Sequence, residues 1–125
     1  MPKILIVDDN EIFRMVLEEK LTKEHFDVVT AGTGEEGLKQ AKKEQPDMIL
    51  LDVKMPGMSG ITFLLELNRE DSTNDIPVLV TSDLGSFDKL ADRVDLGVRG
   101  FMLKAETSTE EFVTRIKKEL DIESE

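Results

Sequence analysis

The sequence predicts an α/β fold built on one parallel β-sheet with helices on both faces. Short apolar runs alternate with segments of helical periodicity five times along the 125 residues. The third run, Met48–Leu51, carries four apolar residues without a break, which is typical of a strand buried on both faces of a parallel sheet. Successive strands start roughly 20 to 30 residues apart, which suits right-handed helical crossovers, so we expect a three-layer sandwich of five βα units.

Length and composition indicate a single small globular domain over residues 1–125. The 27 acidic and 16 basic residues give a formal net charge of −11, which repels phosphate backbones and argues against direct nucleic-acid binding. The absence of cysteine excludes disulfides, thiol catalysis and cysteine-ligated zinc. The first apolar run is too short for a signal peptide or a membrane span, so we expect a cytoplasmic protein without membrane insertion.

The first half of the chain contains three predicted strands, at 3–7, 27–31 and 48–52, and two helices. Asp9 or Asn10 is expected to cap the first helix, because its side chain can accept from a free amide of the first turn. Residues 32–34 turn the chain into the second helix, and Pro46 ends that segment. The residues expected to face the core are Ile12, Phe13, Val16, Leu17 and Leu21 in the first helix, and Leu38 and Ala41 in the second.

The second half continues the alternation, with strands predicted at 78–82 and 101–104. Gly97 and Gly100 are expected to bracket the turn before the last strand. The third helix should begin near Ser59 and the last at Ser108 or Thr109, and the acidic tail 121–125 should fray. The residues expected to pack inwards are Ile61, Leu64, Leu65 and Leu67 in the third helix, Phe87, Leu90, Ala91 and Val94 in the fourth, and Phe112, Val113, Ile116 and Leu120 in the fifth.

Polar side chains follow the predicted strands at their carboxyl ends, where function gathers in open α/β sheets. Asp8 and Asp9 follow the first strand, and Asp52 closes the third. If these strands are neighbours, the three carboxylates share a pocket that requires a compensating cation, and their hard oxygen ligands suit Mg²⁺. Ser82 and Lys104 end the fourth and fifth strands, and a hydroxyl and an ammonium facing a metal-bound carboxylate make a pocket for a phosphoryl group.

Each of these residues also has an ordinary structural explanation. Asp9 can be a helix cap, Lys104 a surface lysine and Ser82 a turn residue. The arrival of all five at strand ends favours a common site.

Over essentially its whole length, the chain resembles a response-regulator receiver domain of two-component signalling, of the single-domain, chemotaxis-regulator-like kind. The matching parts are Asp8-Asp9, residues 52–60 (DVKMPGMSG), Ser82 and Lys104, and the spacings of 30 residues from Asp52 to Ser82 and 52 to Lys104 match as well. The resemblance implies a flavodoxin-like sheet with strand order 2-1-3-4-5.

The resemblance also implies a role for each matching residue. Asp52 would accept a phosphoryl group from a histidine kinase or phosphotransfer protein as an acyl phosphate. Mg²⁺ would be held by Asp8, Asp9, Asp52 and the backbone carbonyl of Lys54. Lys104 would pair with the phosphoryl group, Ser82 would reach towards it on activation, and Phe101 would be the aromatic switch, although it could equally be an ordinary core residue. Thr81 should point away from the site, because alternate strand residues face opposite sides.

Two features depart from the family pattern. Ala105 follows Lys104 where proline is usual, often after a cis bond, and we expect a trans peptide here because a cis bond before a residue other than proline costs roughly 3 kcal/mol. Asp83 and Leu84 follow Ser82 where a small residue is more usual. These departures bear on the geometry of the switch more than on Asp52.

Three other functions are alternatives. Gly32–Gly37 fits the dinucleotide-binding pattern G-x-G-x-x-G, but Glu35 and Glu36 would repel a pyrophosphate, and strands two and three are not neighbours in the expected sheet. A pseudo-receiver that binds partners without phosphorylation is a second alternative. A metal-dependent phosphatase for small phosphates is a third, disfavoured because the chain offers no cap to enclose a substrate and His25 lies far from the pocket.

The resulting expectation is a stand-alone phosphorylation switch. It is a signalling phosphoacceptor that takes part in its own phosphotransfer and dephosphorylation, not an enzyme acting on other substrates. Phosphorylation would rearrange the face made by the fourth helix, fifth strand and fifth helix, around residues 87–104. The signal would then pass to a downstream protein by direct contact, from a monomer or a weak phosphorylation-dependent homodimer.

Overall fold

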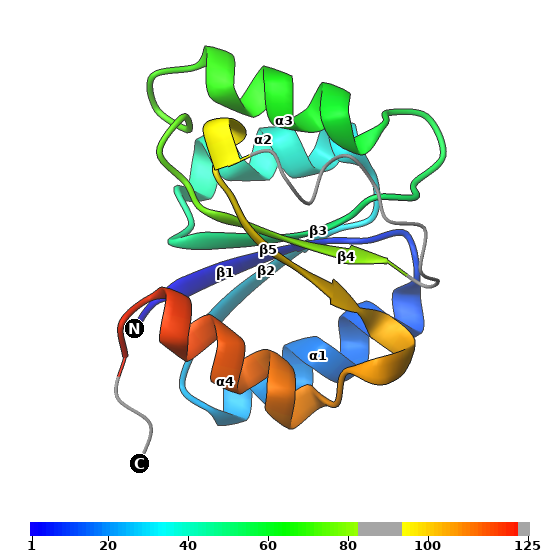
Figure 1. Cartoon of the computed structure of the whole chain (residues 1–125), viewed down its shortest axis with the longest axis vertical. Coiled ribbons are helices and arrows are strands. Elements are labelled where there is room, and N and C mark those ends of the chain that lie inside the picture. Colours follow the sequence, from blue (N-terminus) through cyan, green and yellow to red (C-terminus); the bar gives the residue numbers. More distant parts are fainter. Residues whose placement is uncertain (83–93, 123–125) are drawn as a thin grey trace.

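Five parallel strands form one sheet in the predicted order β2-β1-β3-β4-β5 (Figure 1). The structure is a computed structural model and describes residues 1–82 and 94–122. The strands are β1 (Lys3–Val7), β2 (Asp27–Ala31), β3 (Met48–Asp52), β4 (Val78–Ser82) and β5 (Val98–Leu103). The first four have the predicted bounds. The β1 and β3 strands lie side by side at the centre, with Val7 opposite Leu51.

The helices lie in two layers, with α2 and α3 on one face of the sheet and α1 and α4 on the other (Figure 1). Their bounds are α1 (Glu11–Lys23), α2 (Gly34–Glu44), α3 (Gly60–Arg69) and α4 (Thr109–Glu119), and the two short 3-10 turns are η2 (Val94–Leu96) and η3 (Lys104–Glu106). Among residues 1–82 and 94–122, no helix combines the length and the apolar character needed to cross a membrane.

Side-chain caps fix where the helices begin. Asn10, Thr33 and Ser59 each accept a hydrogen bond from a backbone amide three residues later. Ser108 and Glu111 form a reciprocal capping box at the start of α4. These bonds satisfy amides that have no partner within the helix, which is why Asn10, Ser59 and Ser108 were expected near helix starts.

Alternation along the strands divides the apolar core into two halves. Leu5, Ile49 and Leu51 pack on the side of α2 and α3, while Ile4, Ile6 and Leu50 pack on the side of α1 and α4. Every residue of β3 and β4 is buried. The unbroken apolar run that predicted β3 therefore reflects burial on both faces.

The helix faces correct the predictions at three positions. Ile12 and Val16 were expected in the core, but their side chains are 74% and 51% exposed, and Leu65 is 45% exposed. Phe63, which was not predicted to pack inwards, is fully buried. A residue next to a buried one lies about 100° away around the helix axis, so an apolar neighbour of the buried stripe can still face solvent. The predicted core residues Phe87, Leu90 and Ala91 lie outside the described residues.

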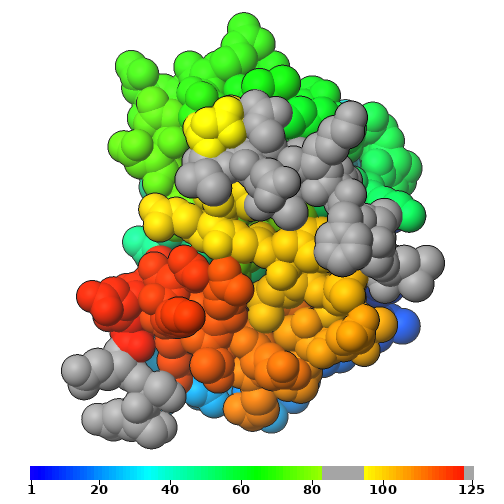
Figure 2. Space-filling model, in the orientation of Figure 1, coloured from blue at the N-terminus to red at the C-terminus, as the bar shows by residue number. Residues whose placement is uncertain are grey.

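The start of β5 also differs from the prediction. The strand begins at Val98, three residues early, and Gly100 lies within it opposite Leu79 instead of in the preceding turn. Tertiary contacts accompany this earlier start: the guanidinium of Arg115 fills the space beside Gly100 and donates a 2.9 Å hydrogen bond to the carbonyl of Arg99. Figure 2 shows the yellow and orange atoms of β5 on the surface next to α4.

Candidate functional site

The sheet order brings the predicted carboxylates together. Because Val7 and Leu51 are register partners on neighbouring strands, the residues that follow them, Asp8 and Asp52, lie side by side at the carboxyl edge. Asp9 joins them, and one carboxylate oxygen from each of the three residues lies within 4.8 Å of the others. This edge is where strand order reverses between β1 and β3, the usual position of a ligand site in an open α/β sheet.

Two of the three carboxylates are buried and one is exposed. Asp8 is 1% and Asp52 2% exposed, whereas Asp9 faces solvent. One oxygen of each buried carboxylate is held by the main chain: Asp8 Oδ1 accepts from the amide of Asn10 at 2.8 Å, and Asp52 Oδ1 accepts from the amide of Lys54 at 3.2 Å. Their second oxygens face a common cation.

That cation is Lys104. Its Nζ lies 2.5 Å from Asp8 Oδ2 and 3.3 Å from Asp52 Oδ2, and its side chain is only 7% exposed. Lys104 does not end β5 as predicted; it is the first residue of η3, directly after the strand. The peptide to Ala105 is trans, as expected for a non-proline residue.

Opposing effects act on the pKa of Asp52. Burial raises the pKa of its carboxyl group, and the negative charge of Asp8 raises it further. Lys104 and the amide of Lys54 lower it, and the balance leaves the Asp52 pKa at about 6. The site therefore holds more negative charge than one ammonium compensates.

The donor set fits a hard divalent cation. Three carboxylates offer oxygen ligands, two from the loop after β1 and one from the end of β3, and oxygen ligands are what Mg²⁺ prefers. The incomplete compensation of Asp52 is a second indication, because a bound cation would favour its ionised form. The backbone amide of Lys54 donates to Asp52, and the role of its carbonyl as a metal ligand stays a prediction.

Ser82 ends β4, the strand next to β3, and Phe101 lies within β5, the strand beyond it. Ser82 is fully buried at the end of β4 and pairs in register with Leu103, the residue before Lys104. Phe101 is partly buried and packs against the core under α2 and α3. The Thr81 hydroxyl is directed at main chain, because it donates to the carbonyl of Leu51 at 3.4 Å. Asp83 and Leu84 lie outside the described residues.

Two residues of α1 contribute to the site that sequence reasoning did not identify. Arg14 donates from a guanidinium nitrogen to the backbone carbonyl of Asp8 at 2.5 Å, which ties α1 to the loop that carries the carboxylates. The ring of Phe13, predicted only as a core residue, has its centroid 4.6 Å from Lys104 Nζ. No local motif signals either contact, since both depend on how α1 docks on the sheet.

The glycine motif at residues 32–37 serves packing. Strand β1 separates β2 from β3, so the loop after β2 and Asp52 do not lie on adjacent strands. A Cβ at Gly37 would lie 2.9 Å from a methyl carbon of Val7 and 3.0 Å from the ring of Phe63. Close approach of α2 to the sheet explains this glycine without a nucleotide.

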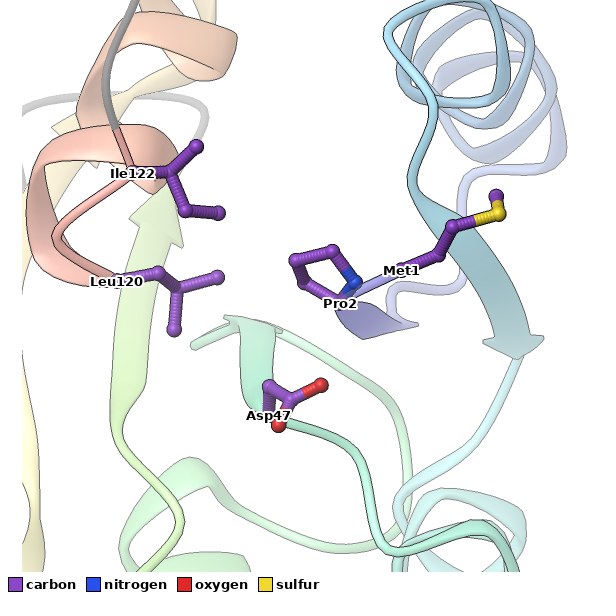
Figure 3. A pocket seen from close by; sticks show the side chains of 5 residues that line it. All are labelled: Met1, Pro2, Asp47, Leu120 and Ile122. Atoms are coloured by element: carbon purple, nitrogen blue, oxygen red, sulfur yellow. The ribbon is translucent and has the colours of Figure 1, made fainter.

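A hollow at the opposite edge of the sheet is unconnected with these groups. Met1, Pro2, Asp47, Leu120 and Ile122 line it, and Figure 3 shows Asp47 beneath the two aliphatic side chains from the end of the chain. Asp47 is already engaged, because its Oδ2 accepts from the backbone amide of Lys3 at 2.7 Å. This hollow therefore offers no chemistry comparable to that of the carboxylate cluster.

Comparison with known proteins gives a consistent result. The family described as the response regulator receiver domain matches residues 4–117. The response regulator PleD of Caulobacter vibrioides is 39% identical over 102 residues, which cover 82% of this chain and 22% of PleD. The alkaline phosphatase synthesis transcriptional regulatory protein PhoP of Bacillus subtilis is also 39% identical over 102 residues, covering 82% of this chain and 42% of PhoP. The chain thus spans less than half the length of these curated relatives.

Solved structures show the same likeness along nearly the whole chain. The chemotaxis protein CheY4 of Vibrio cholerae superposes with a TM-score of 0.85 at 28% identity, over 94% of this chain and 98% of that one. A response regulator from Chloroflexus aurantiacus superposes with a TM-score of 0.83 at 31% identity, over 97% of this chain and 99% of that one.

Proposed function

Because the chain belongs to the response regulator receiver domain family of two-component systems, we propose that it is a phosphorylation switch whose phosphoacceptor is Asp52. The observation that carries the proposal is the placement of a buried lysine between two buried carboxylates, with Nζ 3.3 Å from Asp52 Oδ2. A carboxylate beside a fixed cation at the carboxyl edge of the sheet is suited to accept a phosphoryl group and to hold its added charge.

In the proposed reaction, a carboxylate oxygen of Asp52 attacks the phosphorus of a phosphohistidine on a histidine kinase or phosphotransfer protein. A new phosphorus–oxygen bond forms while the phosphorus–nitrogen bond breaks, and the imidazole departs with the electron pair. The ammonium of Lys104 is close enough to shift from the carboxylates to the phosphoryl oxygens. Mg²⁺ held by Asp8, Asp9, Asp52 and the Lys54 carbonyl would supply positive charge to the same oxygens.

In the proposed function, Ser82 and Phe101 form the switch that responds to phosphorylation. Ser82 would donate to a phosphoryl oxygen, and Phe101 would change its packing with it. The alternation of side chains along the strands supports this link between Ser82 and Phe101. Val80 opposes Phe101 in register, and Ser82 lies two residues beyond Val80 on the same side of β4. The face formed by η2, β5 and α4 would then present two surfaces to a downstream protein. A cytoplasmic location and a signal passed by direct protein contact belong to the same proposal.

The decisive test is intact mass after incubation with acetyl phosphate, with and without Mg²⁺. We expect one added phosphoryl group that requires Mg²⁺ and is absent from Asp52→Asn, a variant that keeps the shape of the side chain and removes the nucleophile. Equal labelling of Asp52→Asn would contradict the role of Asp52. Absence of an adduct on the unmodified protein after rapid quenching would favour a pseudo-receiver that binds its partner without phosphorylation.

The role of Lys104 can be separated from that of Asp52. We expect Lys104→Ala to accept the phosphoryl group but to show a weaker conformational response, because the cation that follows the phosphoryl oxygens is gone. The measurement is the change in the backbone amide spectrum between phosphorylated and unphosphorylated protein, with Lys118→Ala on α4 as the surface control. An undiminished spectral change in Lys104→Ala would contradict this role.

A further inference from the structure

An aromatic ring lies against the ammonium group at the centre of the site. The Nζ of Lys104 is 4.6 Å from the centroid of the Phe13 ring, within the range at which the face of an aromatic ring attracts a cation. The Lys104 side chain is 93% buried, so water screens this attraction little. Among its neighbours in the described part of the chain, the ammonium thus has two carboxylates and one ring of negative potential.

The position of the ring is fixed by the core. Phe13 lies on α1, and the ring of Phe112 on α4 packs edge-on against it, with 5.8 Å between centroids and 72° between planes. Figure 1 shows α1 and α4 together on one face of the sheet, and the two helices are in contact. Phe13 also packs against the apolar cluster that contains Leu17 and Phe112. The ring is therefore a preorganised partner for Lys104.

We propose that Phe13 is a positioning residue for phosphoryl transfer, whose ring face holds the Lys104 ammonium beside Asp52. This inference rests on the proposed function of Asp52. In the structure, the shorter of the two carboxylate contacts of Lys104 is with Asp8, at 2.5 Å against 3.3 Å for Asp52. A divalent cation on Asp8 would compete for that carboxylate and repel the ammonium. The Phe13 ring is not a ligand for the cation, so its attraction for Lys104 would remain.

The backbone at Lys104 makes such a hold useful in this chain. Ala105 follows Lys104, and residues 104–106 form a 3-10 turn with an ordinary trans peptide. Alanine imposes no restriction on its own backbone comparable to the fixed φ of proline. The orientation of Lys104 therefore depends more on its side-chain contacts with the carboxylates and the ring than it would if proline followed it.

A purely structural role for Phe13 makes a different prediction. If the ring only fills space between α1 and α4, any apolar group of the same shape serves equally well. Fluorine substitution on the ring separates the two cases, because it weakens the negative potential of the ring face while leaving its shape nearly unchanged.

The experiment introduces phenylalanine with one, two or three ring fluorines at residue 13 alone, in the full chain. We expect the Mg²⁺-dependent rate of labelling by acetyl phosphate to fall stepwise along the series, by about three- to tenfold at three fluorines. The matched control places the same residues at Phe112, which touches the Phe13 ring, and there the rate should change little. A flat series at residue 13, or equal slopes at both positions, overturns the proposal.

A second measurement, made without metal or phosphodonor, tests the contact itself. In protein with ¹³C-labelled lysine, the ε-methylene protons of Lys104 should resonate upfield, because their carbon is bonded to the nitrogen that lies over the ring. Phe13→Leu should abolish that shift and slow labelling, while Phe13→Tyr should restore both. An unshifted Lys104 signal in the unmodified protein overturns the contact. If the unmodified protein forms no adduct at all, the proposed function fails and the role in transfer falls with it, whereas the lysine spectrum still decides the contact.

Discussion

Asp52 is a buried carboxyl group whose ionisation is set by its neighbours. Burial and the charge of Asp8 raise its pKa to about 6, in spite of the ammonium of Lys104 at 3.3 Å. Folding in the absence of a divalent cation therefore works against the ionised form of Asp52. The residue proposed to react is destabilising in the resting protein, which is common for functional groups held ready in a site.

This imbalance predicts a specific pH dependence of stability. The folded pKa of about 6 exceeds the ordinary value of 3.8, so between these values the folded state binds more protons than the unfolded state, and stability falls as pH rises. Without metal, Asp52→Asn should therefore exceed the unmodified protein in free energy of unfolding by about 1–3 kcal/mol above pH 7.

Urea unfolding measured from pH 4 to pH 8 checks the prediction. The difference between Asp52→Asn and the unmodified protein should grow up to about pH 6 and then level off. Asp47→Asn, at the opposite edge of the sheet, is the control that should lack this pattern. A difference that is constant across the range would show that Asp52 has an ordinary pKa in the folded protein.

At the scale of the elements, Gly37 decides how closely α2 approaches the sheet. Glycine within a helix costs up to about 1 kcal/mol relative to alanine, and the sequence offers no local reason to accept that cost. The structure supplies one, because a Cβ at this position would lie 2.9 Å from Val7 and 3.0 Å from Phe63, both fully buried. Space for the backbone outweighs helix propensity.

Gly37→Ala should therefore destabilise the protein in spite of the better helix propensity of alanine. We expect the overpacking to cost about 1–3 kcal/mol, more than the propensity gains. The measurement is urea unfolding beside Lys39→Ala, an exposed position on the same helix. A Gly37→Ala protein as stable as the parent would mean that α2 can move outwards at little cost.

Strand β5 and η3 show a second case in which packing between elements overrides a local signal. Gly97 and Gly100 suggested a turn, and only Gly97 has the positive φ, of 89°, that favours glycine in one. Gly100 instead makes room for Arg115 of α4, which bonds to the neighbouring carbonyl. The added residues of β5 thus pair with β4 and pack against the arginine of α4.

At the scale of the whole molecule, negative charge is the dominant feature. A net charge of −11 surrounds a site where three carboxylates lie together and one lysine pairs with two of them. A divalent cation that binds only the folded state stabilises it by mass action, by about 2.7 kcal/mol at a hundred times its dissociation constant. The same net charge disfavours close approach to other polyanions.

We therefore expect millimolar MgCl2 to raise the thermal midpoint of unfolding above that in NaCl of equal ionic strength. Asp9→Asn should lose most of this difference, because it removes a ligand oxygen, and its exposed position should leave the core unaffected. Differential scanning calorimetry on both proteins makes the measurement. An equal response of the two proteins to MgCl2 would show that the cation acts elsewhere on the acidic surface.

The sequence by itself determined the fold class, the bounds of four strands, the approximate starts of α1, α3 and α4, and the approximate position of the carboxylate site. It could do so because these depend on local physics: Met48–Leu51 is apolar throughout, Asn10 and Ser108 cap the amides next to them, and Asp8 and Asp52 end their strands. Sheet order then made Asp8 and Asp52 neighbours.

Only the tertiary structure decided which apolar residues are buried and which charges meet. Ile12 and Val16 look like core residues in the sequence, but they face solvent because Phe13, Leu17 and Leu21 define the docked side of α1. The contact of Phe13 with Lys104 joins residues 91 positions apart, and its distance depends on how α1 and η3 pack on the same sheet. No local preference encodes such a contact. In our proposal, this contact holds the Lys104 ammonium beside Asp52.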